Sequence, residues 1–336
     1  MQQRLAALLA LAAFGLLILV SRGSYTPAED EVARISFQIA TGPSDGTFFT
    51  IGQAMAGLIS HPPGVGRCEI STVCGPSGVI LSARTTRGSF DSITAVNNGL
   101  IDSAVVQADI AQAAVTGQAP FRRPQRQLRA VAALFSEQVH LVVLSGAAIG
   151  KVSDLIGKRV ALGAAQSDSA LTAREILYAF GVGPGSVRRI DSDDPAADLA
   201  AGKLDAFFVI AGAPSSMVAA ALKSGKAKLL PIEGEVAQQL LKDDSQLAAG
   251  RIAAGAYPGT PETPTLATRA VWMVNARAPD SLVYGLVRAL FNPANHAPLA
   301  ASHPAAGEIE LGSAAQNLPL PLHSGAARYY REVGKL

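Results

Sequence analysis

The sequence predicts an α/β protein in which parallel strands are flanked by helices. Short β-type segments alternate with helix-type segments along most of the chain, which is the pattern of βαβ units. Two longer β-rich runs, Leu128–Leu144 and Thr265–Val274, interrupt this alternation. We interpret these runs as strands that cross twice between two lobes and form a hinge. The predicted lobes are residues 34–139 together with 265–336, and residues 140–264.

Each predicted element ends at residues that usually stop or cap it, such as Gly, Asn, Asp or Pro. In the first lobe we expect strands over 34–40, 69–73 and 103–107, helices over 48–60 and 89–97, and a helix capped by Asp109. In the second lobe we expect strands over 159–162, 187–190, 206–210 and 228–232, a helix over 169–180, and helices opening at Asp194 and Pro214. Helices are expected again from Asp280 onward.

The composition excludes several classes of protein. A chain of 336 residues is long enough for about two domains. With 49% hydrophobic and 16% charged residues, it is not a disordered chain. A net charge of +2 and only 5% aromatic residues argue against a nucleic-acid partner. Two cysteines exclude a disulfide-rich scaffold and most structural zinc sites.

The amino terminus has the pattern of an export signal. An unbroken apolar run, Leu5–Val20, follows Arg4, and acidic residues come soon after it at 29–31. We expect residues 1–23 to be either a cleaved signal peptide or an uncleaved N-terminal anchor. Either way, the rest of the chain is predicted to be exported and soluble, outside the cytoplasm.

Export permits a disulfide between the two cysteines. Cys68 and Cys74 are six positions apart, and Pro76 and Gly78 follow, as expected near a turn. We predict a small loop-closing disulfide; a pair of reduced cysteines is the alternative.

The motifs of the common hydrolases, metalloenzymes and nucleotide-binding enzymes are missing. The segment Gly75–Gly78 does not match a nucleophile elbow, and the five histidines are scattered. The glycines of Gly181–Gly185 follow a predicted helix rather than a strand, which is the wrong place for a dinucleotide fingerprint. We therefore predict no enzyme activity, no metal and no cofactor.

Hydroxyl- and Gly-bearing loops at the carboxyl ends of strands are the candidate binding site. Ligands of open α/β sheets bind at that edge, and helix N-termini there favour an anion such as a carboxylate. Capping and packing are the alternative roles of these side chains. The five loops are Thr41–Thr47, Gly88-Ser89, Gln107–Asp109, Ser167–Ser169 and Ala211–Pro214.

Motifs from about Ile35 to Gly334 resemble the TAXI family of TRAP-transporter solute receptors. They occur in the family's order along nearly the whole chain. They are the loop Ala40–Gly52, Gly88-Ser89, Asp102, Gln107–Asp109, Val139-His140, Gly157–Val160, Leu171–Arg174, Asp205–Phe208, Ala211–Pro214, Ala254–Pro258 and Pro321–Tyr330.

The resemblance implies a two-lobed type II periplasmic-binding-protein fold, capture of a small organic acid or amino acid, and delivery to a TRAP permease in the membrane. A sensor that docks to a membrane partner is the alternative, and an exported enzyme on the same fold is a weaker one. The ligand contacts predicted on this basis are Ser44, Thr47, Phe48, Ser89, Gln107, Asp109, Ser167, Ser169, Thr172 and Ala213.

The chain departs from the family pattern at the candidate pocket. Phe48-Phe49 stands where the family usually has two Tyr, and Ser92 stands where it has Asn. Asp45 and Asp168 add a carboxylate to each of two loops, and these would repel a second carboxylate. We therefore expect a monocarboxylate that carries an apolar or amine-bearing group rather than glutamate.

Overall fold

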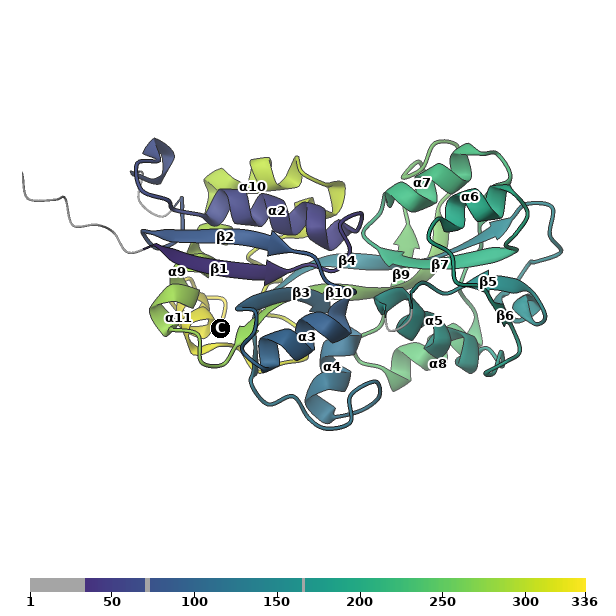
Figure 1. Ribbon diagram of the computed structural model, residues 1–336, viewed down its shortest axis with the longest axis horizontal. Helices are drawn as coiled ribbons and strands as arrows, with labels where there is room; N and C mark the ends of the chain where they lie inside the picture. The colour runs from purple at the N-terminus through teal and green to yellow at the C-terminus, as the bar shows by residue number, and fades with distance from the viewer. Residues whose placement is uncertain (1–33, 70–72, 165–166) are drawn as a thin grey trace, which may run out of the picture. The chain divides into compact units, whose positions relative to one another are not determined.

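The computed structural model describes residues 34–69, 73–164 and 167–336 of the chain (Figure 1). The predicted leader, residues 1–23, lies outside this part. The middle of the strand predicted over 69–73 does too, and Glu69 itself ends a 3-10 turn, η1, at Gly66–Glu69. Among the described residues, no helix combines the length and the hydrophobicity needed to cross a membrane.

A mixed ten-stranded sheet forms the centre of the part of the chain that the structure describes. The neighbouring strands follow the order β2-β1-β3-β10-β4-β7-β5-β6, while β8 pairs with β4 and β9 pairs with β10. The strands are β1 Ile35–Ala40, β2 Val79–Arg84, β3 Ser103–Gln107, β4 Leu128–Leu144, β5 Arg159–Ala161, β6 Arg188–Arg189, β7 Ala206–Ala211, β8 Ala227–Leu229, β9 Ala248–Ile252 and β10 Thr263–Asn275.

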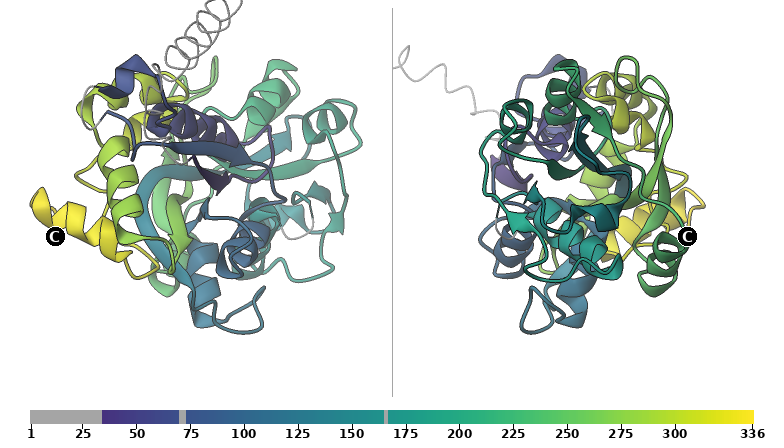
Figure 2. Two further views of the ribbon diagram at one scale, coloured as in Figure 1. Left: turned by 60° about the vertical axis from the view of Figure 1, so that its left-hand side comes forward. Right: turned by 90° about the vertical axis from the view of Figure 1, so that its right-hand side faces the viewer.

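The two long strands predicted from the sequence are confirmed and lie side by side in the middle of the sheet. Strand β4 pairs antiparallel with β10, and the left view of Figure 2 shows them together in blue and green. The first part of β4 pairs with β10, and its later part, from Gln138, pairs with β7. The outer strands on both sides pair in parallel, as β1 does with β2 and β3 and β5 does with β6 and β7.

Helices cover both faces of the sheet (Figure 1). Helix α2 packs on β1 and β2, and α3 and α4 pack on β3; α5 and α6 both contact β7. The helices are α2 Thr47–Ile59, α3 Ser89–Asn97, α4 Ala108–Thr116, α5 Asp168–Ala179, α6 Pro195–Ala200, α7 Ser216–Lys223, α8 Glu235–Asp243, α9 Asp280–Leu290, α10 Pro293–Ala300 and α11 Ser324–Glu332, with 3-10 turns η2 at Val152–Leu155 and η3 at Pro304–Glu308.

The alternation of side chains along the strands builds a separate core on each face. Phe207 and Phe208 are neighbours in β7, yet they belong to different buried clusters. This follows because successive side chains of a strand point to opposite faces of the sheet. Ile39 and Ala40 divide in the same way between two clusters under β1. Both faces of the sheet are therefore buried, as expected for an α/β fold.

Two strands, β2 and β9, were missing from the sequence prediction, and several predicted strands extended past the observed ends, as 187–190 does past β6. Strand β2 alternates buried and exposed residues over most of its length, but it begins with three apolar residues, Val79–Leu81, so the sequence shows no clear period-two pattern there. Strand β9 has no such pattern and forms by pairing with β10. Strand β8 ends at Leu229, before the predicted end at Ile232.

The predicted disulfide is confirmed: Cys68 and Cys74 are bonded, with their Cα atoms 5.2 Å apart. It closes a loop between α2 and β2. Buried Gly75, the residue after the disulfide, donates its N–H to the Ile59 carbonyl at the end of α2, so the loop is attached to this helix.

Tyr257 fastens strand β4 to the start of α7. The side chain is fully buried, and its hydroxyl accepts the Ser215 N–H and lies 2.9 Å from Nε2 of His140. Burial lowers the pKa of His140 to about 4, so its imidazole is neutral at physiological pH. The Ala254–Pro258 motif therefore has a structural role.

Replacing Tyr257 by Phe should lower the free energy of unfolding by about 1–3 kcal/mol, because the buried Ser215 N–H loses its acceptor. The measurement is urea unfolding followed by circular dichroism. Tyr178→Phe is the matched control, since Tyr178 is 73% exposed, and it should have almost no effect. Equal stability of the two variants would contradict this role of Tyr257.

Candidate functional site

A pocket of about 310 Å³ lies at the carboxyl ends of β1, β5 and β7. Its wall combines residues from the two segments that the sequence assigned to different lobes. The outer segment supplies residues from 41–50, Arg87, Gly88, Glu137 and His303, and the inner segment supplies residues from 163–169, 192–195 and 208–217. A pocket therefore lies at the edge of the sheet that was predicted from the loop chemistry.

The loop after β1 forms one wall. Thr47 and Phe48, the first residues of α2, are buried and line the pocket. The ring of Phe48 packs edge-on against Phe135 of β4, with 6.0 Å between the ring centres. No side chain caps the N-terminus of α2. Backbone N–H groups at this helix start are therefore available to a ligand.

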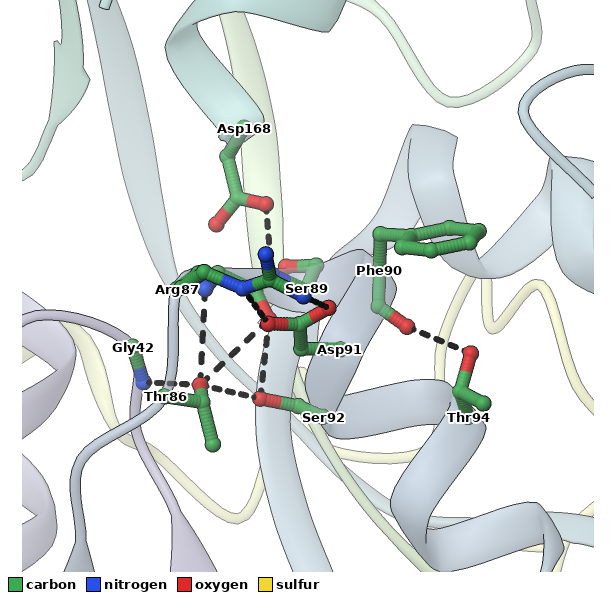
Figure 3. A network of polar contacts seen from close by, with 10 residues as sticks. Gly42, Thr86, Arg87, Ser89, Phe90, Asp91, Ser92, Thr94 and Asp168 are labelled. Atoms are coloured by element: carbon green, nitrogen blue, oxygen red, sulfur yellow. Dashed lines mark hydrogen bonds and ion pairs between the residues drawn. The ribbon is translucent and has the colours of Figure 1, made fainter. Parts of the chain in front are cut away.

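Asp168 lies at the start of α5 and places its carboxylate at the N-terminus of α3 (Figure 3). Its Oδ1 accepts the Ser89 N–H at 2.6 Å. Gly88 has a φ of +142°, and a Cβ built there would lie 3.0 Å from this oxygen. A carboxylate of the chain itself therefore occupies the helix start at which we expected a ligand anion.

Hydroxyl groups hold the Gly88-Ser89 turn in place (Figure 3). Thr86 Oγ1 accepts the Gly42 N–H at 3.1 Å and lies 2.8 Å from Ser92 Oγ, which in turn donates to the Gly88 carbonyl. Ser89 Oγ accepts the Gln107 N–H at 2.9 Å. Ser92, at the position where the family has Asn, thus belongs to this network.

Asp109 joins the two segments behind the pocket rather than in its wall. It is 7% exposed, and its carboxylate accepts hydrogen bonds from Thr172 at 2.9 Å and from Thr268 at 3.2 Å. Thr172 belongs to the inner segment and Thr268 to the outer one. Desolvation raises the pKa of Asp109, and these hydrogen bonds partly oppose that rise.

The loops of the inner segment form the opposite wall. Ser167 Oγ caps α5 by accepting the Ala170 N–H, and Ser169 Oγ accepts the Ile210 N–H at the end of β7. The Ala213 N–H donates to Gln138 Oε1 in β4. The pocket hydroxyls of Ser167 and Ser169 therefore already accept hydrogen bonds from the backbone.

Four of the ten predicted contact residues line the pocket, and six do not. Those in the wall are Thr47, Phe48, Ser167 and Ser169; those outside it are Ser44, Ser89, Gln107, Asp109, Thr172 and Ala213. Four of these six residues form the hydrogen bonds described above, which lie beside the wall: Ser89, Gln107, Asp109 and Thr172. Direct contact of any of the ten with a ligand stays a prediction.

The sequence reasoning passed over several residues of the wall. Glu137, Asp193 and His303 were not proposed as contacts, although each lines the pocket. Glu137 had a usable signal, because it is the one acidic residue in the run Leu128–Leu144, which is otherwise rich in apolar residues. Asp194, the neighbour of Asp193 in sequence, does what the sequence indicated: it caps α6 by accepting the Ala197 N–H.

The pocket wall is acidic. It carries the carboxylates of Asp45, Glu137, Asp168 and Asp193. Desolvation raises the pKa of Asp168 to about 7 and that of Glu137 well above its usual range. The basic groups in the wall are Arg87, whose side chain is 75% exposed and paired with Asp91, and His303, whose pKa burial lowers.

A family match covers residues 39–334 and is to the NMT1-like family. The chain belongs to the NMT1-like family. Solved structures share its fold at low sequence identity. A binding-protein component of an ABC phosphonate transporter from Pseudomonas aeruginosa has a TM-score of 0.56 and 12% identity, over 85% of this chain and 83% of that one.

Two further solved structures share this fold. A periplasmic transporter protein has a TM-score of 0.52 and 13% identity over 93% of this chain and 95% of its own. A protein from Bordetella bronchiseptica has a TM-score of 0.50 and 14% identity, over 91% and 83% of the two chains. This NMT1-like protein therefore has the mixed α/β fold of periplasmic binding proteins, and the predicted fold class is confirmed.

The contribution of Asp168 to the free energy of unfolding should fall as the pH rises from 3.8, its ordinary pKa, towards about 7, its value in the fold, whereas the lowered pKa of His140 acts in the opposite direction. In that window Asp168 binds more protons in the folded state than in the unfolded state, so through this group raising the pH favours unfolding. The raised pKa of Glu175, also about 7, acts in the same direction. Asp168→Asn should make this pH dependence shallower.

Urea unfolding at a series of pH values measures the slope. Asn retains an oxygen that can accept the Ser89 N–H, so the variant removes the charge but keeps that contact. Asp191→Asn, at an exposed carboxylate that is not part of the pocket wall, is the control. A slope that is the same in wild type and Asp168→Asn would contradict the prediction.

Proposed function

We propose that this NMT1-like protein is an extracytoplasmic solute receptor. It captures a small organic acid or amino acid between two lobes, residues 34–139 with 265–336 and residues 140–264, and delivers it to the integral-membrane permease of a TRAP transporter. The observation that carries the proposal is the pocket, because its wall is built from both segments at the carboxyl edge of the sheet. The export signal at residues 1–23 would place the receptor in the periplasm, free or anchored.

Two helix N-termini at the pocket support an acidic group on the solute. Gly46 and Thr47 at the start of α2 line the pocket, and so do Ser215 and Ser216 at the start of α7. Among the described residues, the N-cap residue of neither helix makes a side-chain cap, although at α7 the Ser215 N–H is already bound to the Tyr257 hydroxyl. The partial positive charge of these helix starts favours a carboxylate.

The hydrogen bonds that the pocket hydroxyls make agree with binding rather than catalysis. Ser167 and Ser169 accept backbone N–H groups, and Nδ1 of His303 accepts the Ala305 N–H. Among the described residues, no hydrogen bond joins a pocket serine to a histidine, which a serine nucleophile would need as its base. A role in transport also agrees with two of the structures of similar fold, a phosphonate transporter component and a periplasmic transporter.

Close approach of the two segments supports closure around the solute. A Cβ built on Gly212 of the inner segment would lie 2.7 Å from Cβ of Ala305 and 3.1 Å from Cγ2 of Thr47, both of the outer segment. Closure of this kind shifts an existing equilibrium towards the state that holds the ligand.

A panel of amino acids and organic acids should contain a solute that raises the unfolding midpoint of the exported body. A solute that binds only the folded state stabilises it by about 2.7 kcal/mol at a hundredfold excess over Kd. The measurement is thermal unfolding of ligand-free protein. No stabilisation by any member of the panel would count against a solute receptor of this class and favour the sensor alternative.

Replacing Gly212 by Ala should weaken binding of the best solute at least tenfold, because the added methyl group keeps the two segments apart. The free energy of unfolding without solute should change much less. Gly146→Ala is the control, since a Cβ there meets no atom within 4 Å. Unchanged affinity in Gly212→Ala would rule out closure at this contact. Calorimetric titration supplies the affinities.

A further inference from the structure

Glu137 is a buried carboxylate in the wall of the pocket. It lies in β4, directly opposite Thr268 of β10, and is 3% exposed. Its Oε2 is buried and has no hydrogen-bond partner among the described residues. Buried polar atoms in folded proteins almost always have such a partner, so an unpaired carboxylate oxygen beside a cavity indicates a missing partner.

The charged groups that act on Glu137 from the neighbouring helices do not compensate it. They are Asp109 of α4 and Asp168 of α5, and both are acidic. The other carboxylates of the wall are Asp45 and Asp193. Arg87 directs its guanidinium to Asp91, with Nε 2.5 Å from Oδ2 and Nη2 3.0 Å from Oδ1. Among the described residues, no cationic side chain pairs with Glu137.

We propose that Glu137 binds an ammonium group, so that the captured solute carries an amine. This inference rests on the proposed receptor function and decides between its two ligand classes. The ammonium donates to the Glu137 carboxylate, and an acidic group of the solute lies at the N-termini of α2 and α7. An amino acid satisfies both, whereas a plain organic acid leaves Oε2 without a partner. The pocket volume of about 310 Å³ suits a small solute.

The surroundings of Glu137 affect how readily its carboxyl group loses a proton. Burial and the two acidic neighbours raise its pKa well above the usual range, so in the empty pocket Glu137 keeps its proton to a higher pH than an exposed glutamate does. A bound ammonium favours the ionised carboxylate, and the proton leaves to solvent. Binding of an amine should therefore release a proton, and affinity should rise with pH until Glu137 is ionised in the empty pocket.

Matched solutes test the ammonium on the wild-type protein. Each pair differs only in an amine or a hydroxyl group: alanine with lactate, and 4-aminobutyrate with 4-hydroxybutyrate, within a panel that includes all common amino acids and their 2-hydroxy acids. We expect an amine member to raise the unfolding midpoint and its hydroxyl partner to bind at least tenfold more weakly. Calorimetry in buffers of different ionisation enthalpy then measures proton release.

Glu137→Gln keeps the shape of the side chain and removes its charge. We expect it to bind the amine at least tenfold more weakly and to abolish proton release, with folding unharmed because no ion pair is lost. Glu308→Gln is the matched control: it makes the same change at an exposed residue outside the pocket, whose Oε2 accepts the Ser136 N–H next to Glu137. This control should bind as wild type does.

Three results would overturn the assignment. Tight binding of hydroxyl members, equal binding of the amine by Glu137→Gln, or absence of any stabilising amine would each exclude an ammonium site at Glu137. Stabilisation by acids that lack an amine would overturn this inference and leave the receptor function standing. Stabilisation by no solute at all would count against both. The comparison of matched solutes on wild-type protein holds even if the variant does not fold.

Discussion

The antiparallel pairing of β4 with β10 is the constraint on which the other parts of the structure depend. Strand β4 pairs with β10 along its first part and with β7 along its later part, so one strand carries hydrogen bonds of both segments. The parallel strands β1, β2 and β3 then extend the sheet on one side, and β5 and β6 extend it on the other. Glu137 of β4 is in turn part of the wall of the pocket that residues of both segments form.

The junction between the segments contains carboxylates where a stable core would have apolar side chains. Asp109 is held by two threonines, and Asp168 receives the Ser89 N–H, so both have partners within the chain. Glu137 differs, because its Oε2 has none among the described residues. Desolvation makes ionisation of all three unfavourable. These three carboxylates therefore make the pocket wall and its surroundings less stable than an apolar core would be, a cost expected of functional sites.

The same chemistry explains why the anion site expected at Gly88-Ser89 has another occupant. A helix N-terminus attracts any carboxylate within reach, and Asp168 of the inner segment reaches it. Among the described residues, the N-cap residues of α2 and α7 make no side-chain cap, and at α7 the Tyr257 hydroxyl holds only the Ser215 N–H. Helix starts that look equivalent in sequence thus have different roles, according to which residues of the other segment lie opposite them.

The sequence by itself determined the α/β class, the two long strands, the cysteine pair and the edge of the sheet that carries the pocket. These features follow from local signals, namely hydrophobic period, capping residues, spacing and strand ends. Only the tertiary structure decided that β9 pairs with β10, that Thr172 bonds Asp109 rather than lining the pocket, and that Glu137 faces the pocket without a partner. The first two outcomes depend on contacts between residues that are up to some sixty positions apart in the sequence, and the third depends on a contact that is not made. No local pattern of residues encodes such contacts.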